Sequence, residues 1–244
     1  MSFTFDMEVL AHDIDINRNA TPSSITKYLQ ETVDRNLHNS HPTFEELLEN
    51  NLAFVVSRSA LKVYRPLKEY EKISIQTWAT AQKSASFPRN YKIIANNETV
   101  AECVMVWALI DTDKNRLVRG TEFSVEGYGT GDLIELPIDT KLRISKETPF
   151  TKCSTERVLY RDIDRNGHMN NTKYYDLLFG FIPNCQEYYL TSCLMNFVSE
   201  AKLGDDLDIY ISPMEKENDE ISYLFKTEVN GKTNIEAKFT VKHI

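Results

Sequence analysis

An internal repeat constrains the fold of this chain more than any other feature of its sequence. The segment Leu10–Asn17 (LAHDIDIN) matches Leu159–Asn166 (LYRDIDRN) at five of eight positions, at an offset of 149 (159 minus 10). Further along, Glu71–Ile75 resembles Asp205–Ile209 at an offset of 134 (205 minus 71). Because the matches keep their order along the chain, we interpret it as two copies of one supersecondary unit packed together.

A glycine-rich segment separates the two copies. Three of the eight glycines of the 244-residue chain fall between Gly127 and Gly131, as expected of a linker. We therefore predict a first half at 1–125, a linker at 126–152 and a second half at 153–244. The change of offset puts about fifteen extra residues (149 minus 134) into the first copy, between the first motif and the later strands.

Each copy has the pattern of a helix followed by a run of strands. Thr21 is a good cap for a helix with Pro22 at its first position, and Asn170 or Asn171 is the equivalent cap in the second half. Strand-like runs follow at 54–64, 73–82, 86–94, 99–111, 194–201, 207–212, 221–229 and 234–241, with Asn-Asn and Asn-Gly turns typical of hairpins. The pattern predicts an α+β fold in which two tandem helix-plus-antiparallel-sheet units join their sheets.

Composition excludes several classes of function. A net charge of −8 makes nucleic acid a poor partner, because phosphate binding needs a positive field. No apolar run approaches the roughly 20 residues that span a bilayer. The first 15 residues lack the basic start of a signal peptide, so we expect a cytoplasmic protein. The four cysteines show no CxxC spacing and the five histidines no HExxH motif, so we expect no metal and no cofactor.

The two copies differ in the residues that follow their shared motif. Only the second copy carries a histidine, and there Asp164, Asn166 and His168 occupy alternate positions just before the predicted helix. An extended segment places all three on one side, beside unpaired N–H groups that can stabilise an oxyanion. The same residues are equally typical of a strand-to-helix turn in which Asx side chains bond the backbone.

A second candidate is Glu200, at the end of the predicted strand 194–201. Strand alternation predicts that Glu200 lies on the same face of the strand as Leu194 and Val198. At the end of that face, its carboxylate lies either at a solvated rim or in a partly desolvated position suited to general base catalysis. The corresponding stretch of the first half, near Arg65 and Pro66, has no acid. This difference favours one active copy and one degenerate copy.

These residues carry a family resemblance. The run Asp164–Asn171 (DRNGHMNN) resembles the D-x-N-x-H-x-N-N signature of the acyl-acyl-carrier-protein (acyl-ACP) thioesterases, and Glu200 falls where that family has its essential Glu. The strand Ile73–Trp78 and the segment Phe87–Asn90 also look like the family's first half. The resemblance covers nearly the whole chain and implies a double hotdog fold.

The resemblance further implies a catalytic set of Asp164, Asn166, His168 and Glu200. Many members place a Cys directly after the Glu, whereas this chain has Ala201, which favours attack by water. The implied reaction is hydrolysis of fatty acyl-ACP to a free fatty acid in fatty acid biosynthesis. Either Glu200 or His168 is then the base, and direct attack by Glu200 is a third option.

The acyl chain needs an apolar tunnel, which we expect between the two helices and within the first half. The first half's insert contains a capping-box pattern, Thr43–Glu46, and Phe54 and Trp78 are candidate lining residues. Acyl carrier protein is the implied partner. Alternatives left open are an acyl-coenzyme A thioesterase, a hydratase or dehydratase, and a non-catalytic acyl-binding protein; the oligomeric state also stays open, with a homodimer as one option.

Overall fold

A computed structural model describes residues 2–81, 84–114 and 116–244. The first half contains, in chain order, β1 (Phe3–Glu8), α1 (Pro22–His38), α2 (Phe44–Glu49), β2 (Leu52–Val63), β3 (Lys72–Ala79), β4 (Phe87–Ala95), β5 (Glu98–Asp111), β6 (Arg116–Leu117) and the 3-10 helix η1 (Glu126–Tyr128). The second half contains β7 (Thr151–Arg157), η2 (Tyr160–Asp162), α3 (Lys173–Phe179), η3 (Cys185–Glu187), β8 (Tyr188–Phe197), β9 (Asp206–Ile211), β10 (Glu215–Glu217), β11 (Glu220–Val229) and β12 (Lys232–His243).

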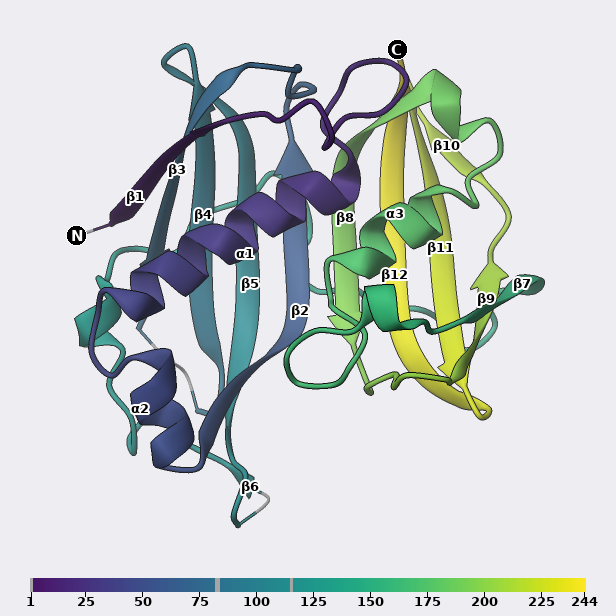
Figure 1. Ribbon diagram of the computed structural model, residues 1–244. Helices are drawn as coiled ribbons and strands as arrows, with labels where there is room; N and C mark the ends of the chain where they lie inside the picture. The colour runs from purple at the N-terminus through teal and green to yellow at the C-terminus, as the bar shows by residue number, and fades with distance from the viewer. Residues whose placement is uncertain (1, 82–83, 115) are drawn as a thin grey trace.

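The strands form one antiparallel sheet in the order β1-β3-β4-β5-β2-β8-β12-β11-β9-β7, with β6 and β10 paired outside this path. The order is symmetric about its centre, since β1 corresponds to β7, β3 to β9, β4 to β11, β5 to β12 and β2 to β8. The two halves join where Arg58–Lys62 of β2 pairs with Ser192–Asn196 of β8. Helices α1 and α3 cover the same face of the sheet (Figure 1). This is the predicted double hotdog arrangement of an α+β chain.

Local sequence signals explain where the helices and hairpins form. The Thr21 hydroxyl accepts a hydrogen bond from the Ser24 N–H at 3.2 Å and caps α1. Thr43 and Glu46 form a reciprocal capping box at the start of α2, as predicted. The turns Asn96-Asn97 and Asn230-Gly231 have positive φ angles throughout, which two-residue hairpin turns require.

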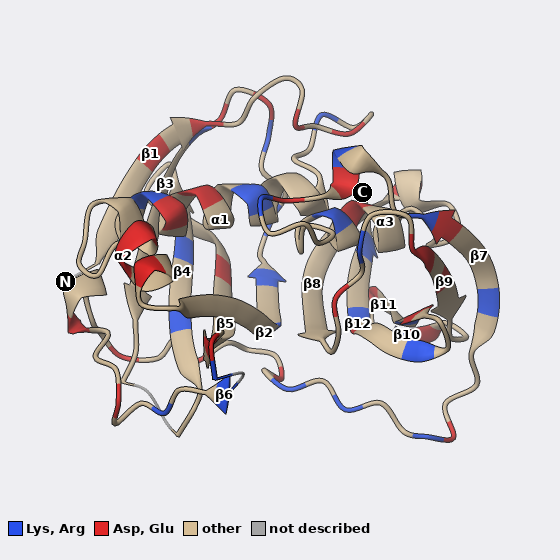
Figure 2. Ribbon diagram, turned by 60° about the horizontal axis from the view of Figure 1, so that its bottom comes forward, with Lys and Arg blue, Asp and Glu red and all other residues tan. Residues whose placement is uncertain are grey.

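The segment between η1 and β7 crosses the face of the sheet opposite the helices (Figure 2). Several hydrogen bonds tie its backbone to the sheet. The Gly131 N–H donates to the Ala79 carbonyl at 3.0 Å and the Ile134 N–H to the Asn90 side chain at 2.9 Å, while Trp78 donates to the Asp132 carbonyl at 2.8 Å and Asn196 to the Leu142 carbonyl at 3.3 Å. Within the described residues, no helix has the length and apolar character required to cross a membrane.

Most predicted strands form close to their predicted positions, although Gln82, the end of one of them, lies outside the described residues. The exception is the strand predicted at 194–201. Strand β8 begins earlier, at Tyr188, and ends at Phe197, because the N–H groups of Val198 and Ser199 both donate to the carbonyl of Asn234. Glu200 therefore lies in the turn after the strand, and its prediction as a strand residue is wrong.

Candidate active site

The segments before helices α1 and α3 fold into the same tight turn, and in each segment one aspartate holds the turn together. The Asp164 carboxylate accepts the backbone N–H groups of Asn166 at 2.8 Å and His168 at 3.4 Å. In the first half, Asp15 accepts those of Asn17 at 2.8 Å and Asn19 at 3.0 Å. Both sets are related by the offset of 149 found in the sequence, so the repeat extends to individual hydrogen bonds.

A second repeated contact joins this turn to the turn after the following strands. The Met169 N–H donates to the Ala201 carbonyl at 2.8 Å, and the Ala20 N–H donates to the Leu67 carbonyl at the same distance. Because of this contact, the side chains of residues 168 and 200 emerge next to each other. The equivalent positions in the first half are occupied by Asn19 and Pro66, and neither side chain can act as an acid or a base.

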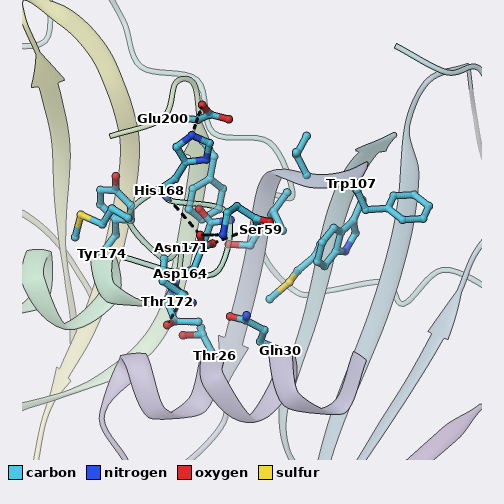
Figure 3. Close-up of a pocket in the computed structure, with 18 of the residues that line it drawn as sticks. Thr26, Gln30, Ser59, Trp107, Asp164, His168, Asn171, Thr172, Tyr174 and Glu200 are labelled. Atoms are coloured by element: carbon cyan, nitrogen blue, oxygen red, sulfur yellow. Dashed lines mark hydrogen bonds and ion pairs between the residues drawn. The ribbon is translucent and has the colours of Figure 1, made fainter. Parts of the chain in front are cut away.

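His168 and Glu200 meet across this junction. The imidazole Nε2 lies 2.9 Å from a Glu200 carboxylate oxygen, and the two side chains are 29% and 58% exposed. Figure 3 shows both at one end of a pocket, with Asp164 and Asn171 beside them. Of the two alternatives for Glu200, the structure places it at the solvated rim.

The remaining two predicted residues occupy the same loop. Asp164 reaches the backbone of His168 and not its ring, so its contacts set the position of the imidazole through the main chain. The Asn166 amide nitrogen lies 3.5 Å from the second Asp164 oxygen, and the Asn166 side chain is exposed at the rim. The structure therefore brings together all four residues predicted from the sequence: Asp164, Asn166, His168 and Glu200.

The helix start differs from the prediction. Helix α3 begins at Lys173, and the Asn170 carboxamide oxygen accepts the N–H of Thr172 at 2.9 Å. The N–H groups of Met169 and Asn170 are also bonded, to Ala201 and Asp162. These three backbone donors are thus occupied and are not available to an oxyanion. Asn171 lies in the signature and lines the pocket, although the sequence predicted it only as a candidate helix cap and not as a site residue.

Neither Ala201, directly after Glu200, nor Cys193, earlier in β8, supplies a thiol nucleophile. Ala201 is buried beside Glu200 and lines the pocket. Cys193 is fully buried within β8, and burial raises the pKa of its thiol well above the usual value. A thiolate is the reactive form of cysteine, so Cys193 is unsuited to attack an acyl group.

The pocket is a cavity of about 560 Å³ that extends from the paired side chains into the first half. Its lining from the first half is mostly apolar and also includes the polar side chains of Thr26, Gln30, Asp34 and Ser59. The apolar side chains come from α1, α2, β2 and β5: Leu37, Phe44, Leu47, Leu52, Phe54, Val55, Val56, Met105, Trp107 and Ile110. The prediction that Phe54 lines the cavity is confirmed, whereas the prediction for Trp78 is wrong, because the tryptophan that lines the cavity is Trp107. Trp78 alternates with the buried Ile73, Ile75 and Thr77 along β3 and faces the other side of the sheet, a signal that the sequence already contained.

A charged contact bridges the loop that carries His168 and the first half. The Arg165 guanidinium lies 3.6 Å from the Asp34 carboxylate of α1 and 3.9 Å above the Phe44 ring centroid of α2. Burial raises the pKa of Asp34, and the attraction of Arg165 offsets part of that effect. Arg165 thereby connects the loop to the helices that cover the cavity.

Comparisons with known proteins match this architecture. The model of the acyl-ACP thioesterase N-terminal domain matches residues 1–128, and that of the C-terminal domain matches residues 146–243. An oleoyl-acyl carrier protein thioesterase of Arabidopsis thaliana is 22% identical over 92% of the chain, which spans 66% of that relative's length. An oleoyl-acyl carrier protein thioesterase of Coriandrum sativum is 22% identical over 98% of the chain, which spans 70% of its length.

Solved structures share the fold over the whole chain. An acyl-ACP thioesterase from Bacteroides thetaiotaomicron superposes with a TM-score of 0.86 at 21% identity, covering 99% of this chain and 98% of its own. A 12:0-ACP thioesterase from Umbellularia californica does so with a TM-score of 0.80 at 16% identity, covering 100% and 94%. Since the family models together span nearly all of the sequence, the chain belongs to the acyl-ACP thioesterase family.

Proposed function

We propose that this chain hydrolyses fatty acyl-ACP to a free fatty acid and ACP, with Asp164, Asn166, His168 and Glu200 as its catalytic set. One observation carries the proposal: a carboxylate and an imidazole 2.9 Å apart stand at a cavity whose lining from the first half is mostly apolar. The pair can handle a proton, while the cavity can hold a hydrocarbon chain.

In the proposed mechanism, water attacks the thioester carbon. Glu200 takes a proton from that water, and His168 holds the carboxylate in position through Nε2. The tetrahedral intermediate then collapses, the carbon–sulfur bond breaks, and the proton passes from the pair to the departing sulfur. Each step conserves charge and atoms without a covalent enzyme intermediate, in keeping with Ala201 in place of a cysteine.

The oxyanion of the intermediate needs donors other than the N–H groups of Met169, Asn170 and Thr172, which are already bonded. We assign this role to the side-chain amides of Asn166 and Asn171, which both line the cavity beside His168. Neutral amides placed where negative charge develops lower the barrier without being reorganised during the reaction. Asp164 acts indirectly, because its carboxylate bonds the backbone of the turn that positions His168.

We further propose that the first half, 1–125, holds the acyl chain and that the second, 153–244, supplies the reacting groups. The lining of the cavity supports this division, since most of its apolar side chains come from the first half. We place the reaction in the cytoplasm, where the four cysteines, all free in the structure, would stay reduced.

A hydrolysis assay with two carriers tests the proposal. The purified protein is given the same acyl chains on ACP and on coenzyme A, and both free thiol and free fatty acid are measured. We expect equal amounts of thiol and fatty acid, with a higher kcat/KM on ACP. A preference for coenzyme A would reassign the carrier, an enoyl thioester product would indicate a hydratase or dehydratase, and tight binding without turnover would indicate an acyl-binding protein.

A further inference from the structure

Phe54 separates the main cavity from a second, smaller one. The smaller cavity, of about 30 Å³, is lined by residues including Val33, Phe87, Val125 and Tyr128. Three side chains, Leu37, Phe54 and Trp107, line both cavities and so form the wall between them. Figure 3 shows Trp107 on the side of the main cavity away from His168 and Glu200.

We infer that Phe54 ends the acyl chamber and thereby limits the length of the acyl chain that this enzyme accepts. The inference rests on the proposed function, because it takes the main cavity as the place of the hydrocarbon chain. A chain that starts at the thioester beside His168 runs along the cavity and meets this wall with its methyl end. Leu37 and Trp107 are the other two side chains of this wall.

The ring of Phe54 is fixed by its neighbours. Its centroid lies 5.5 Å from that of Phe87, 6.4 Å from Trp107, 5.7 Å from Phe123 and 6.5 Å from Tyr128, all in edge-to-face geometry. Such pairs are favourable beyond the area that they bury. Since four rings surround it, Phe54 acts as a rigid stop for a hydrocarbon chain.

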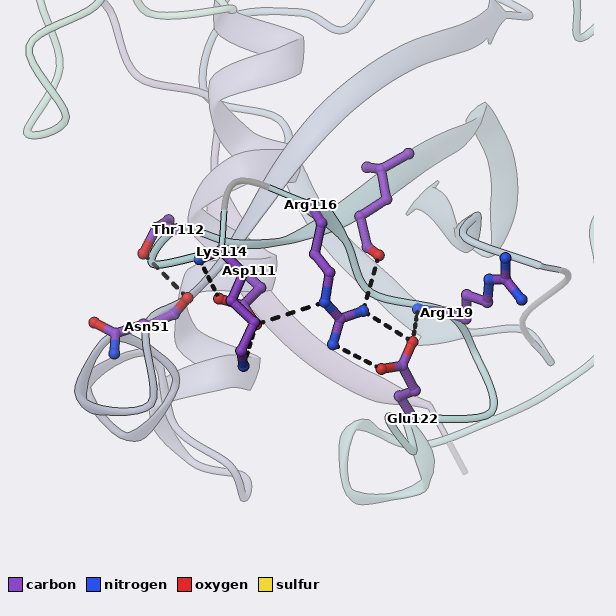
Figure 4. A network of polar contacts seen from close by, with 8 residues as sticks. Asn51, Asp111, Thr112, Lys114, Arg116, Arg119 and Glu122 are labelled. Atoms are coloured by element: carbon purple, nitrogen blue, oxygen red, sulfur yellow. Dashed lines mark hydrogen bonds and ion pairs between the residues drawn. The ribbon is translucent and has the colours of Figure 1, made fainter.

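The segment that carries Phe123, Val125 and Tyr128 is itself held by a polar network (Figure 4). Arg116 makes a two-pronged contact with Glu122, at 3.2 and 2.8 Å, and the Arg119 N–H donates to the same carboxylate at 3.0 Å. The Thr112 N–H donates to the Asn51 carbonyl at 2.8 Å, just before β2 begins. These bonds fix the outer wall of the small cavity relative to the strand that bears Phe54.

The small cavity has a polar end, which limits how far a longer chain could extend. Arg89, which lines it, is almost fully buried. The Arg89 guanidinium donates to Thr77 Oγ1 at 2.9 Å and to the Asn36 side-chain oxygen. Removing the Phe54 ring would therefore join the two cavities and lengthen the chamber only as far as Arg89.

The test compares acyl chains of increasing length in three variants. Phe54→Ala joins the cavities, and Phe54→Leu is a milder opening in case the larger deletion unfolds the protein. Phe181→Ala is the matched control, because Phe181, like Phe54, is a partly buried ring packed against the core but lies in the second half, outside the described lining of both cavities. For each protein, kcat/KM is measured on acyl-ACP, and the affinity for free fatty acids of the same lengths is measured by displacement of a fluorescent fatty acid.

For each protein we compare longer with shorter chains, as a ratio of kcat/KM values and as a ratio of fatty acid affinities. In Phe54→Ala we expect both ratios to rise by about fourfold for each additional methylene that the chamber accepts. Phe54→Leu should shift the ratio in the same direction by less, and Phe181→Ala should leave it unchanged. An unchanged ratio in folded Phe54→Ala, or an equal shift in Phe181→Ala, would overturn the inference. If neither the unchanged protein nor any variant hydrolyses a thioester, the proposed function fails. The affinities for free fatty acids then still decide whether Phe54 ends the chamber.

Discussion

At the scale of single residues, the two halves share a scaffold and differ in what it presents. Asp15 and Asp164 make the same pair of backbone hydrogen bonds, but the turn presents Asn19 in one half and His168 in the other. Pro66 likewise stands where the second half has Glu200. A turn that stabilises both halves has thus been combined with an acid–base pair in only one of them.

This shared scaffold gives a matched pair of variants. Asp164→Ala and Asp15→Ala each remove a carboxylate that accepts two backbone N–H groups, so each should lower the free energy of unfolding by about 1–3 kcal/mol. Only Asp164→Ala should also lower kcat, because only that turn positions His168. Urea unfolding and steady-state kinetics on acyl-ACP check both effects; equal loss of kcat in the two variants would show that Asp164 has no particular role at the site.

The family resemblance predicted both residues, because His168 lies in the D-x-N-x-H-x-N-N signature and Glu200 falls where that family has its essential Glu. It did not predict how they meet. Strand alternation from Leu194 continues through Ala201, but the ladder breaks after Phe197 when two N–H groups share the Asn234 carbonyl. Such a break depends on a strand far along the chain, so no local pattern reveals it.

At the scale of elements, the starts of α1 and α3 are locked together. The Asp176 carboxylate of α3 accepts the Ser23 N–H at 2.7 Å and the Thr21 hydroxyl at 2.8 Å, both at the first turn of α1. Ser23 in turn donates to the Thr172 carbonyl at 2.6 Å and accepts the Asp176 N–H at 3.0 Å. The sequence predicted the local cap, Thr21, but the cap supplied by the other helix depends on tertiary packing.

Asp176→Ala should destabilise the protein by about 1–2 kcal/mol, since an acid at a helix N-terminus caps free N–H groups and interacts favourably with the helix dipole. Asp219 is a suitable control, because its side chain is 86% exposed and Asp219→Ala should change stability by less than about 0.5 kcal/mol. Chemical denaturation of both variants provides the measurement. Equal stabilities would mean that the contact between the helices contributes nothing.

At the scale of the whole molecule, the halves form one sheet and one core. The β2–β8 ladder joins them at the centre, and a single buried cluster contains side chains of both, such as Leu61 and Phe239. The repeat predicted two units, but it could not indicate which strands join, since all strands of the repeat alternate in a similar way. The asymmetry of the cavity was easier to foresee, because the extra residues of the first half include α2.

We expect the two halves to unfold in one transition. Both tryptophans, Trp78 and Trp107, lie in the first half, so their fluorescence reports that half alone, while far-ultraviolet circular dichroism reports the whole chain. If the central ladder and shared core couple the halves, the two signals should have the same denaturation midpoint. A tryptophan transition clearly separated from the circular dichroism transition would indicate halves that unfold independently.

The central claim is that His168 and Glu200 act as one unit on a thioester. The most direct measurement is kcat/KM on acyl-ACP for Glu200→Gln, His168→Ala and the double variant, with folding checked by circular dichroism. Each single change should lower kcat/KM by about 10²-fold or more, and the double variant should lose far less than the product of the two losses, because residues that act as a unit are not additive. Near-normal hydrolysis in either single variant, or losses that multiply in the double variant, would contradict the account.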